Sequence, residues 1–154
     1  MKILIAYDGS RSADEAVDEV VRRPWPPSTQ VRLVTVLEAT TPMPAEIGAE
    51  LYGPVLEKIR ESQREAMQQA LHRAAGKFAS HPELRVDTQM RDGSVHRGLL
   101  EAIKEFNADL VVAGSHGANA LERFVLGSVS HALVTHAPCS VEIVKRHPPE
   151  GAKS

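Results

Sequence analysis

The sequence predicts an α/β fold, a single domain built on an open parallel sheet of five strands with helices on both faces. Short apolar runs alternate along the whole chain with longer stretches whose apolar residues recur at helical spacing. The 154 residues, of which 42% are hydrophobic, suit one domain with an ordinary core. We therefore expect one domain over residues 1–146 and a disordered tail over residues 147–154.

The amino-terminal part should form two strands with a helix between them. Ile3 to Tyr7 is a continuous apolar run, which is typical of a strand buried on both faces. Ser10 can cap the following helix, and Pro24 marks its end. The second strand is expected over residues 31–37.

The middle of the chain should contain a loop over residues 38–53, a long helix and a third strand. Pro54 suits the first turn of the helix, which we expect to run to about residue 79. Polar residues are interleaved over residues 84–90, as in a strand at or near a sheet edge. The apolar residues of the long helix that should face the core are Ile59, Met67, Ala70, Leu71, Ala74 and Phe78.

The carboxyl-terminal part should add a helix, a strand, another helix and a last strand. We expect the strands over residues 108–113 and 140–144, and the last helix from Ser128 to about His136. Strands and helices then alternate throughout, which predicts parallel strands joined by right-handed crossovers. The first of these two helices should bury Val95, Leu99, Ala102, Ile103 and Phe106.

The segments that directly follow two of the strands, called strand exits below, carry residues suited to a ligand. Their positions favour one strand order. Ligands of open parallel sheets bind at the carboxyl ends of the strands, where the strand order reverses. The first strand ends in residues 7–10 (Tyr-Asp-Gly-Ser) and the fourth in residues 114–117 (Gly-Ser-His-Gly). The order 3-2-1-4-5 makes these exits neighbours. In the alternative order, 2-1-3-4-5, the strand order would reverse beside residues 91–93, which are less suited to binding a ligand.

The fourth exit has the features of a phosphate site. Gly114 and Gly117 are followed, after nine residues, by Gly127 and Ser128 at the start of a helix. Glycines permit positive φ and close approach of a ligand to the backbone. The first N–H groups of the helix attract anions, and the hydroxyls of Ser128 and Ser130 can donate further hydrogen bonds. The alternative is an ordinary strand-to-helix loop with a glycine turn.

These residues resemble the universal stress protein family over nearly the whole chain, residues 2–144. The family motif G-x2-G-x9-G-[S/T] is matched by the glycines and serine of the fourth exit. Residues 3–10 and 109–117 are similar to the family's first strand and its most diagnostic stretch, with Ala113 where methionine is usual. Residues 137–141 are similar to the approach to its last strand, although Pro-Val is more usual there.

The resemblance implies a Rossmann-like fold of the adenine nucleotide alpha hydrolase-like type, binding ATP or AMP with or without Mg²⁺. Asp8 would bind the ribose hydroxyls, although it could instead cap the first helix. The backbone of Val36 would meet the adenine edge. His116 could offset phosphate charge, or it is a solvated loop residue. The remaining residues of the expected nucleotide site are Tyr7, Ala113, Gly114, Gly117, Gly127, Ser128, Val129 and Ser130.

Composition excludes several other classes of protein. Eighteen Lys and Arg against twenty Asp and Glu argue against a nucleic-acid partner. A single cysteine, Cys139, excludes an internal disulfide, and the seven histidines lack metal-ligand spacing. No apolar stretch approaches the roughly 20 residues that span a membrane. We expect a reduced, cytoplasmic protein with no membrane partner and no metal site.

The expected function is that of a nucleotide-binding regulatory protein of the stress response, with no catalytic residues. Phosphoryl transfer needs a charge-neutralising lysine and a residue that places the attacking nucleophile, whereas the glycine loop contains no lysine and, apart from Glu122, no carboxylate. The alternative is an enzyme on the same fold, either a slow ATPase or a nucleotidyl- or phosphoryl-transfer enzyme.

The last strand should make the protein a homodimer. Residues 140–144 are rich in β-branched side chains and lie at a sheet edge in the order 3-2-1-4-5, which offers a template for pairing. Proteins of the family that it resembles commonly dimerise through this strand. The alternative is a monomer whose edge is protected by Glu142 and Lys145.

Overall fold

The computed structural model confirms the predicted fold class and strand order. It describes residues 1–38, 49–116 and 126–145, so the predicted tail lies outside the described residues. All strand pairs are parallel, and the sheet has the order β3-β2-β1-β4-β5, not the alternative 2-1-3-4-5. The strands are β1 (Lys2–Ala6), β2 (Gln30–Leu37), β3 (Arg85–Asp92), β4 (Leu110–Gly114) and β5 (Ser140–Val144).

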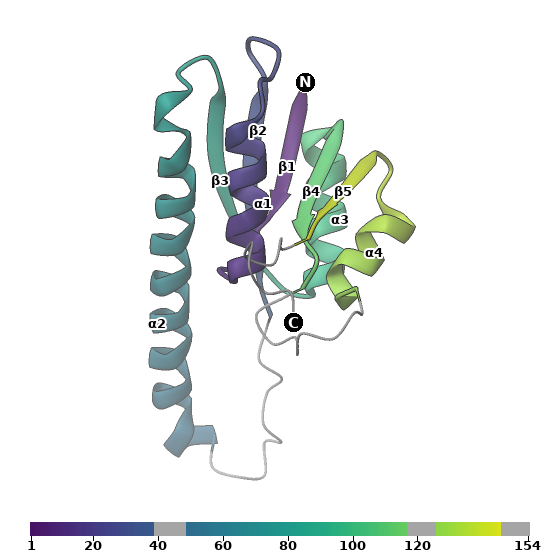
Figure 1. Ribbon diagram of the computed structural model, residues 1–154. Helices are drawn as coiled ribbons and strands as arrows, with labels where there is room; N and C mark the ends of the chain where they lie inside the picture. The colour runs from purple at the N-terminus through teal and green to yellow at the C-terminus, as the bar shows by residue number, and fades with distance from the viewer. Residues whose placement is uncertain (39–48, 117–125, 146–154) are drawn as a thin grey trace, which may run out of the picture.

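Helices cover both faces of this sheet (Figure 1). On one face lie α1 (Arg11–Arg22) and α2 (Ala49–Gly76), which continues into the 3₁₀ turn η1 (Lys77–Ser80). On the other face lie α3 (Val95–Phe106) and α4 (Ser128–His136). None of the helices in these described segments is long and apolar enough to cross a membrane.

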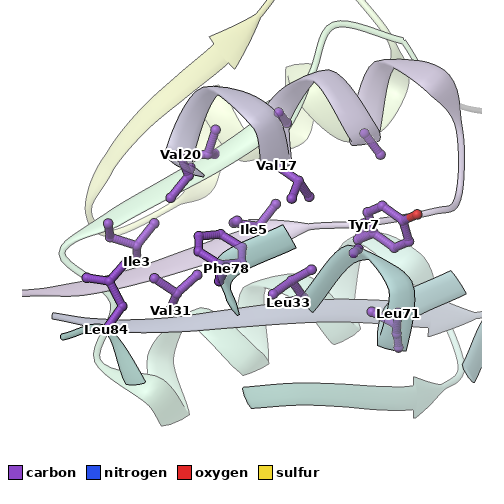
Figure 2. Packing of buried hydrophobic residues seen from close by; sticks show 14 residues of the cluster. Ile3, Ile5, Tyr7, Val17, Val20, Val31, Leu33, Leu71, Phe78 and Leu84 are labelled. Carbon is purple, nitrogen blue, oxygen red and sulfur yellow. The ribbon is translucent and has the colours of Figure 1, made fainter. Parts of the chain in front are cut away.

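The central strand β1 belongs to both hydrophobic cores. Ile3 and Ile5 point to the α1 face, where they pack with Val17 and Val20 (Figure 2). Leu4 belongs to the core on the α3 face. All these side chains are 0–1% exposed, and burying each one stabilises the fold by about 1.5–3 kcal/mol. The continuous apolar run of the first strand therefore reflects burial on two sides.

Helix α1 begins and ends at specific polar contacts. Ser10 is its N-cap, because its Oγ accepts a hydrogen bond of 3.1 Å from the N–H of Ala13. At the other end, Arg23 donates two hydrogen bonds of 2.7 and 2.6 Å to the carboxylate of Glu142 on β5. Helix α1 is thereby tied to the edge strand.

The long helix differs from the sequence prediction in two respects. It begins at Ala49, so Pro54 lies inside the helix and not in its first turn. Near a helix start this proline removes one backbone hydrogen bond, to the carbonyl of residue 50. Ile59, predicted to be buried, is 48% exposed. This part of α2 extends past the end of the sheet, where the described segments provide no surface to cover it (Figure 1).

Gly114, at the end of β4, packs directly against the backbone of α1. A Cβ built on Gly114 would lie 2.4 Å from Oγ, 2.5 Å from the carbonyl oxygen and 2.6 Å from the carbonyl carbon of Ser12. Two of these three atoms belong to the main chain, so they cannot move aside as a side chain can. The absence of a side chain at Gly114 therefore sets how closely α1 approaches β4.

Replacing Gly114 by Ala should lower the free energy of unfolding by about 1–3 kcal/mol, the usual cost of overpacking. Urea denaturation measures the change, and Gly76→Ala is the matched control, since a Cβ at Gly76 meets nothing within 4 Å. Adding Ser12→Ala should not restore stability, because the carbonyl group of residue 12 remains. Full rescue by that second change would contradict the backbone clash.

Candidate functional site

A pocket opens at the carboxyl ends of β1, β2 and β4. Its volume is about 550 Å³, within the range of about 300–1,000 Å³ that small-molecule sites have. Gly117 lies outside the described residues. All the other residues predicted for the site line this pocket: Tyr7, Asp8, Val36, Ala113, Gly114, His116, Gly127, Ser128, Val129 and Ser130.

Asp8 lines the pocket and also holds the turn that follows β1. Its Oδ1 accepts a hydrogen bond of 2.9 Å from the N–H of Ser10, while Ser10 itself caps α1. Asp8 is exposed, and a carboxylate has about four acceptor positions on its two oxygens. The turn contact therefore leaves this group chemically able to accept from vicinal hydroxyls.

Tyr7 lines the pocket, but its hydroxyl is engaged on the α1 face of the sheet. The phenol points to the α1 face and donates a hydrogen bond of 3.1 Å to Asp14 (Figure 2). Burial, and next the negative charge of Asp14, raise the pKa of Tyr7 to about 12, so the phenol stays protonated. The Tyr7 carbonyl accepts from Thr35 Oγ1 at 2.6 Å.

The backbone of Val36 faces the pocket because β1 ends before β2 does. The Val34 carbonyl accepts from the N–H of Tyr7 at 2.9 Å, so Val34 turns its polar groups toward β1. Two residues later in a strand, Val36 turns its groups the same way. The ladder between β1 and β2 stops at Ala6 and Val34, and no bond to the Val36 backbone occurs there within the described segments. One donor and one acceptor are thus presented side by side.

The start of α4 forms another wall of the pocket. Gly127 is the N-cap, and the first helical hydrogen bond runs from the N–H of His131 to its carbonyl. The N–H groups of Ser128, Val129 and Ser130 precede that bond, and in the described chain none of them has a partner. They carry partial positive charge, which suits an anion such as a phosphate.

Two sequence expectations about this wall are wrong. Ser130 Oγ donates to the Gly114 carbonyl at 2.7 Å and is buried, so its hydroxyl proton is already used in the fold. Gly127 has a φ of −57°, and positive φ among the described glycines occurs at Gly9 and Gly93 instead. Gly114 and Gly127 therefore do not form a left-handed turn, and Gly114 serves close packing against α1.

His116 is half-buried and not a solvated loop side chain. The ring nitrogen Nδ1 lies 2.8 Å from Ser115 Oγ. The backbone N–H of His116 donates a hydrogen bond of 3.4 Å to Ser12 Oγ. Its Nε2 is buried, and it has no hydrogen-bond partner in the segments that the structure describes. The imidazole therefore has one satisfied nitrogen and one that could meet a polar group in the pocket.

Sequence reasoning missed the pocket residues that come from other elements. Val95, His96 and Leu99 at the start of α3 line the pocket, as do Met67 of α2 and Glu38 after β2. Helical periodicity identified three of them as core residues, but only the sheet order brings α3 beside the end of β2. No group of three His, Cys, Asp or Glu that could hold a metal ion occurs in the described part of the chain.

Comparison with known proteins agrees with this architecture. A relative from Staphylococcus epidermidis, named for the universal stress proteins, is 31% identical over 144 residues, which is 93% of this chain and 82% of the relative. The universal stress protein UspA from Lactobacillus plantarum has a TM-score of 0.79 at 22% identity, covering 94% of this chain and 97% of its own.

A universal stress protein family member from Arabidopsis thaliana, solved with AMP bound, has a TM-score of 0.68 at 18% identity and covers 100% of this chain and 99% of its own. At these identities the two structures establish a shared fold. The sequence model of the universal stress protein family matches residues 1–145 of this chain. The chain therefore belongs to the universal stress protein family.

Proposed function

We propose that this protein binds an adenine nucleotide, ATP or AMP, in the pocket at the carboxyl ends of β1, β2 and β4. One observation carries the proposal: groups suited to the three parts of a nucleotide converge on a single 550 Å³ pocket. The Arabidopsis protein that shares the fold was solved with AMP, which supports an adenine nucleotide as the ligand.

Each part of the nucleotide has a chemically suitable partner. The backbone donor and acceptor of Val36 match the N1 and amino group of adenine, and the Asp8 carboxylate accepts from ribose hydroxyls. The N–H groups of residues 128–130, with Gly127 and His116 beside them, suit the phosphates. Gly117, outside the described residues, completes the glycine motif in the sequence and belongs to the same proposed phosphate site.

Binding, and not rapid catalysis, is the proposed role, in a regulatory protein of the stress response. The described lining residues include no lysine or arginine to neutralise a transferring phosphoryl group. Mass spectrometry of nucleotide released from freshly purified protein tests the ligand, and incubation with ATP and Mg²⁺ tests turnover. Turnover well above about one per second, the low end for typical enzymes, would favour the enzyme alternative.

Replacing Asp8 by Ala should weaken ATP binding by about 1.5–3 kcal/mol, the range for hydrogen bonds to a charged group. Calorimetric titration with ATP and with 2′,3′-dideoxy-ATP measures it, and the second ligand should lose much less. Asp8→Asn is the control for the turn, since an amide oxygen can still accept from the N–H of Ser10. Equal losses for both ligands would show that Asp8 acts through the turn.

Replacing Gly127 by Val should abolish ATP binding and leave the fold intact. The φ of −57° is open to valine, so the added side chain obstructs the pocket wall without straining the backbone. Titration with ATP and a thermal melt separate binding from folding. Gly76→Val, at a position with open space and away from the pocket, is the control. Undiminished affinity in folded Gly127→Val protein would refute the phosphate site.

We further propose a homodimer paired through β5. The Val144 carbonyl accepts from the N–H of Ser115 beside β4, so Val144 turns its polar groups inward. Alternate residues of a strand turn opposite ways, and Ile143 therefore presents its N–H and carbonyl at the open edge. Glu142, which could have protected that edge, is held by Arg23 over α1.

Ile143→Pro should convert the dimer to a monomer by removing an outward donor, whereas Ile143→Ala keeps the donor and should remain dimeric. Light scattering at micromolar concentration is the measurement. A wild-type mass near 16.8 kDa, and not twice that value, would show that the strand does not pair.

A further inference from the structure

Helix α3 packs closely against strand β2 at a glycine, Gly98. Gly98 is buried in the first turn of α3, where its N–H donates to the Ser94 carbonyl at 2.8 Å. A Cβ built on Gly98 would lie 3.0 Å from both γ carbons of Val36. That separation is tighter than ordinary van der Waals contact, so a side chain here would force Val36 or the helix to move.

The backbone of Gly98 does not itself require glycine. Its conformation is helical, and it is not among the described residues with positive φ. Inside a helix, glycine is less favourable than alanine by about 0.5–1 kcal/mol. A residue that weakens its helix is therefore explained here by the close approach to Val36.

Helix α3 cannot easily yield to relieve such a contact. Its inner face buries Leu99, Ala102, Ile103 and Phe106, all at 5% exposure or less. Packed interiors resist displacement, because moving one helix opens gaps along its whole inner face. Val36 is half-buried at the end of its strand, so Val36 is the residue that would shift.

The contact lies at the base end of the proposed nucleotide site. Val36 lines the pocket from β2, and Val95 and Leu99, which flank Gly98 on α3, line it from the helix. The backbone of Val36 is also the proposed partner of the adenine edge. A shift of Val36 would therefore move the donor and acceptor that read the base, while Asp8 and the start of α4 stay in place.

We propose that Gly98 is a positioning residue that sets the place of Val36 and thereby the affinity of the site for the base. The inference rests on the proposed nucleotide function. It assigns to a buried helix residue, with no expected ligand contact of its own, control over one of the three groups that bind the nucleotide.

A double-mutant cycle tests this coupling. Gly98→Ala should weaken ATP binding by about tenfold. A tenfold change in affinity corresponds to a free energy at the lower end of the usual cost of overpacking. Val36→Ala removes both γ carbons that the new methyl group would meet, so Gly98→Ala combined with Val36→Ala should bind ATP more tightly than Gly98→Ala alone. Gly76→Ala is the matched control, with no neighbour within 4 Å, and should bind ATP as the wild type does.

Calorimetry gives the affinities, and thermal melts confirm that each variant is folded. Val36→Ile, which enlarges the other partner of the same contact, serves if Gly98→Ala does not fold, and it should also weaken ATP. Folded Gly98→Ala or Val36→Ile protein with wild-type affinity, or purely additive effects in the cycle, would overturn the inference. Wild-type protein that fails to bind any adenine nucleotide would instead overturn the proposed function.

Discussion

Burial of β1 on both of its faces is the constraint on which the rest of this structure depends. Ile3, Leu4 and Ile5 are fully buried, with alternate side chains supplied to the two cores. A strand of this kind can only be central, so it needs a strand on each side, which here are β2 and β4, and a helical layer over each face. The exits of β1, β2 and β4 then meet at one edge of the sheet, and the pocket lies there.

The polar chemistry of the pocket comes largely from main chain that has lost its regular partners. Strand β1 ends at Ala6 while β2 continues to Leu37, which leaves the backbone of Val36 facing the pocket. Helix α4 begins at the same edge, and the residues that carry its first unpartnered N–H groups line the cavity in the part of the chain that the structure describes. Such groups suit a ligand with many acceptors, and they allow the surrounding side chains to serve the fold.

Several side chains beside the pocket do serve the fold. The Tyr7 phenol is held by Asp14, and the Ser130 hydroxyl by the Gly114 carbonyl. Gly114 and Gly98 lack side chains because α1 and α3 pack there, against Ser12 and Val36 respectively. The contacts that hold the helices to the sheet therefore also shape the site. A substitution that alters this packing alters the geometry that the pocket offers to a ligand.

The sequence alone determined the fold class, the strand order and the pocket residues that follow β1 and β4, together with Val36 of β2, but not those that α2 and α3 supply. This was possible because buried parallel strands are continuous apolar runs, and because Asp8 and several glycines and serines follow the first and fourth strands. Its errors were local in character. Helix α2 begins five residues before Pro54, and Ile59 is exposed because this part of the helix extends past the end of the sheet.

The tertiary structure decided which atoms of those residues remain available. Periodicity places Tyr7 at a strand end but does not state that Asp14 takes its hydroxyl, and spacing does not reveal that Ser130 donates to Gly114. The contributions of Val95, His96 and Leu99 depend on α3 packing beside β2, a contact between elements far apart in the chain. Local sequence patterns carry backbone preference and burial, whereas hydrogen-bond partners are chosen only when separate elements meet.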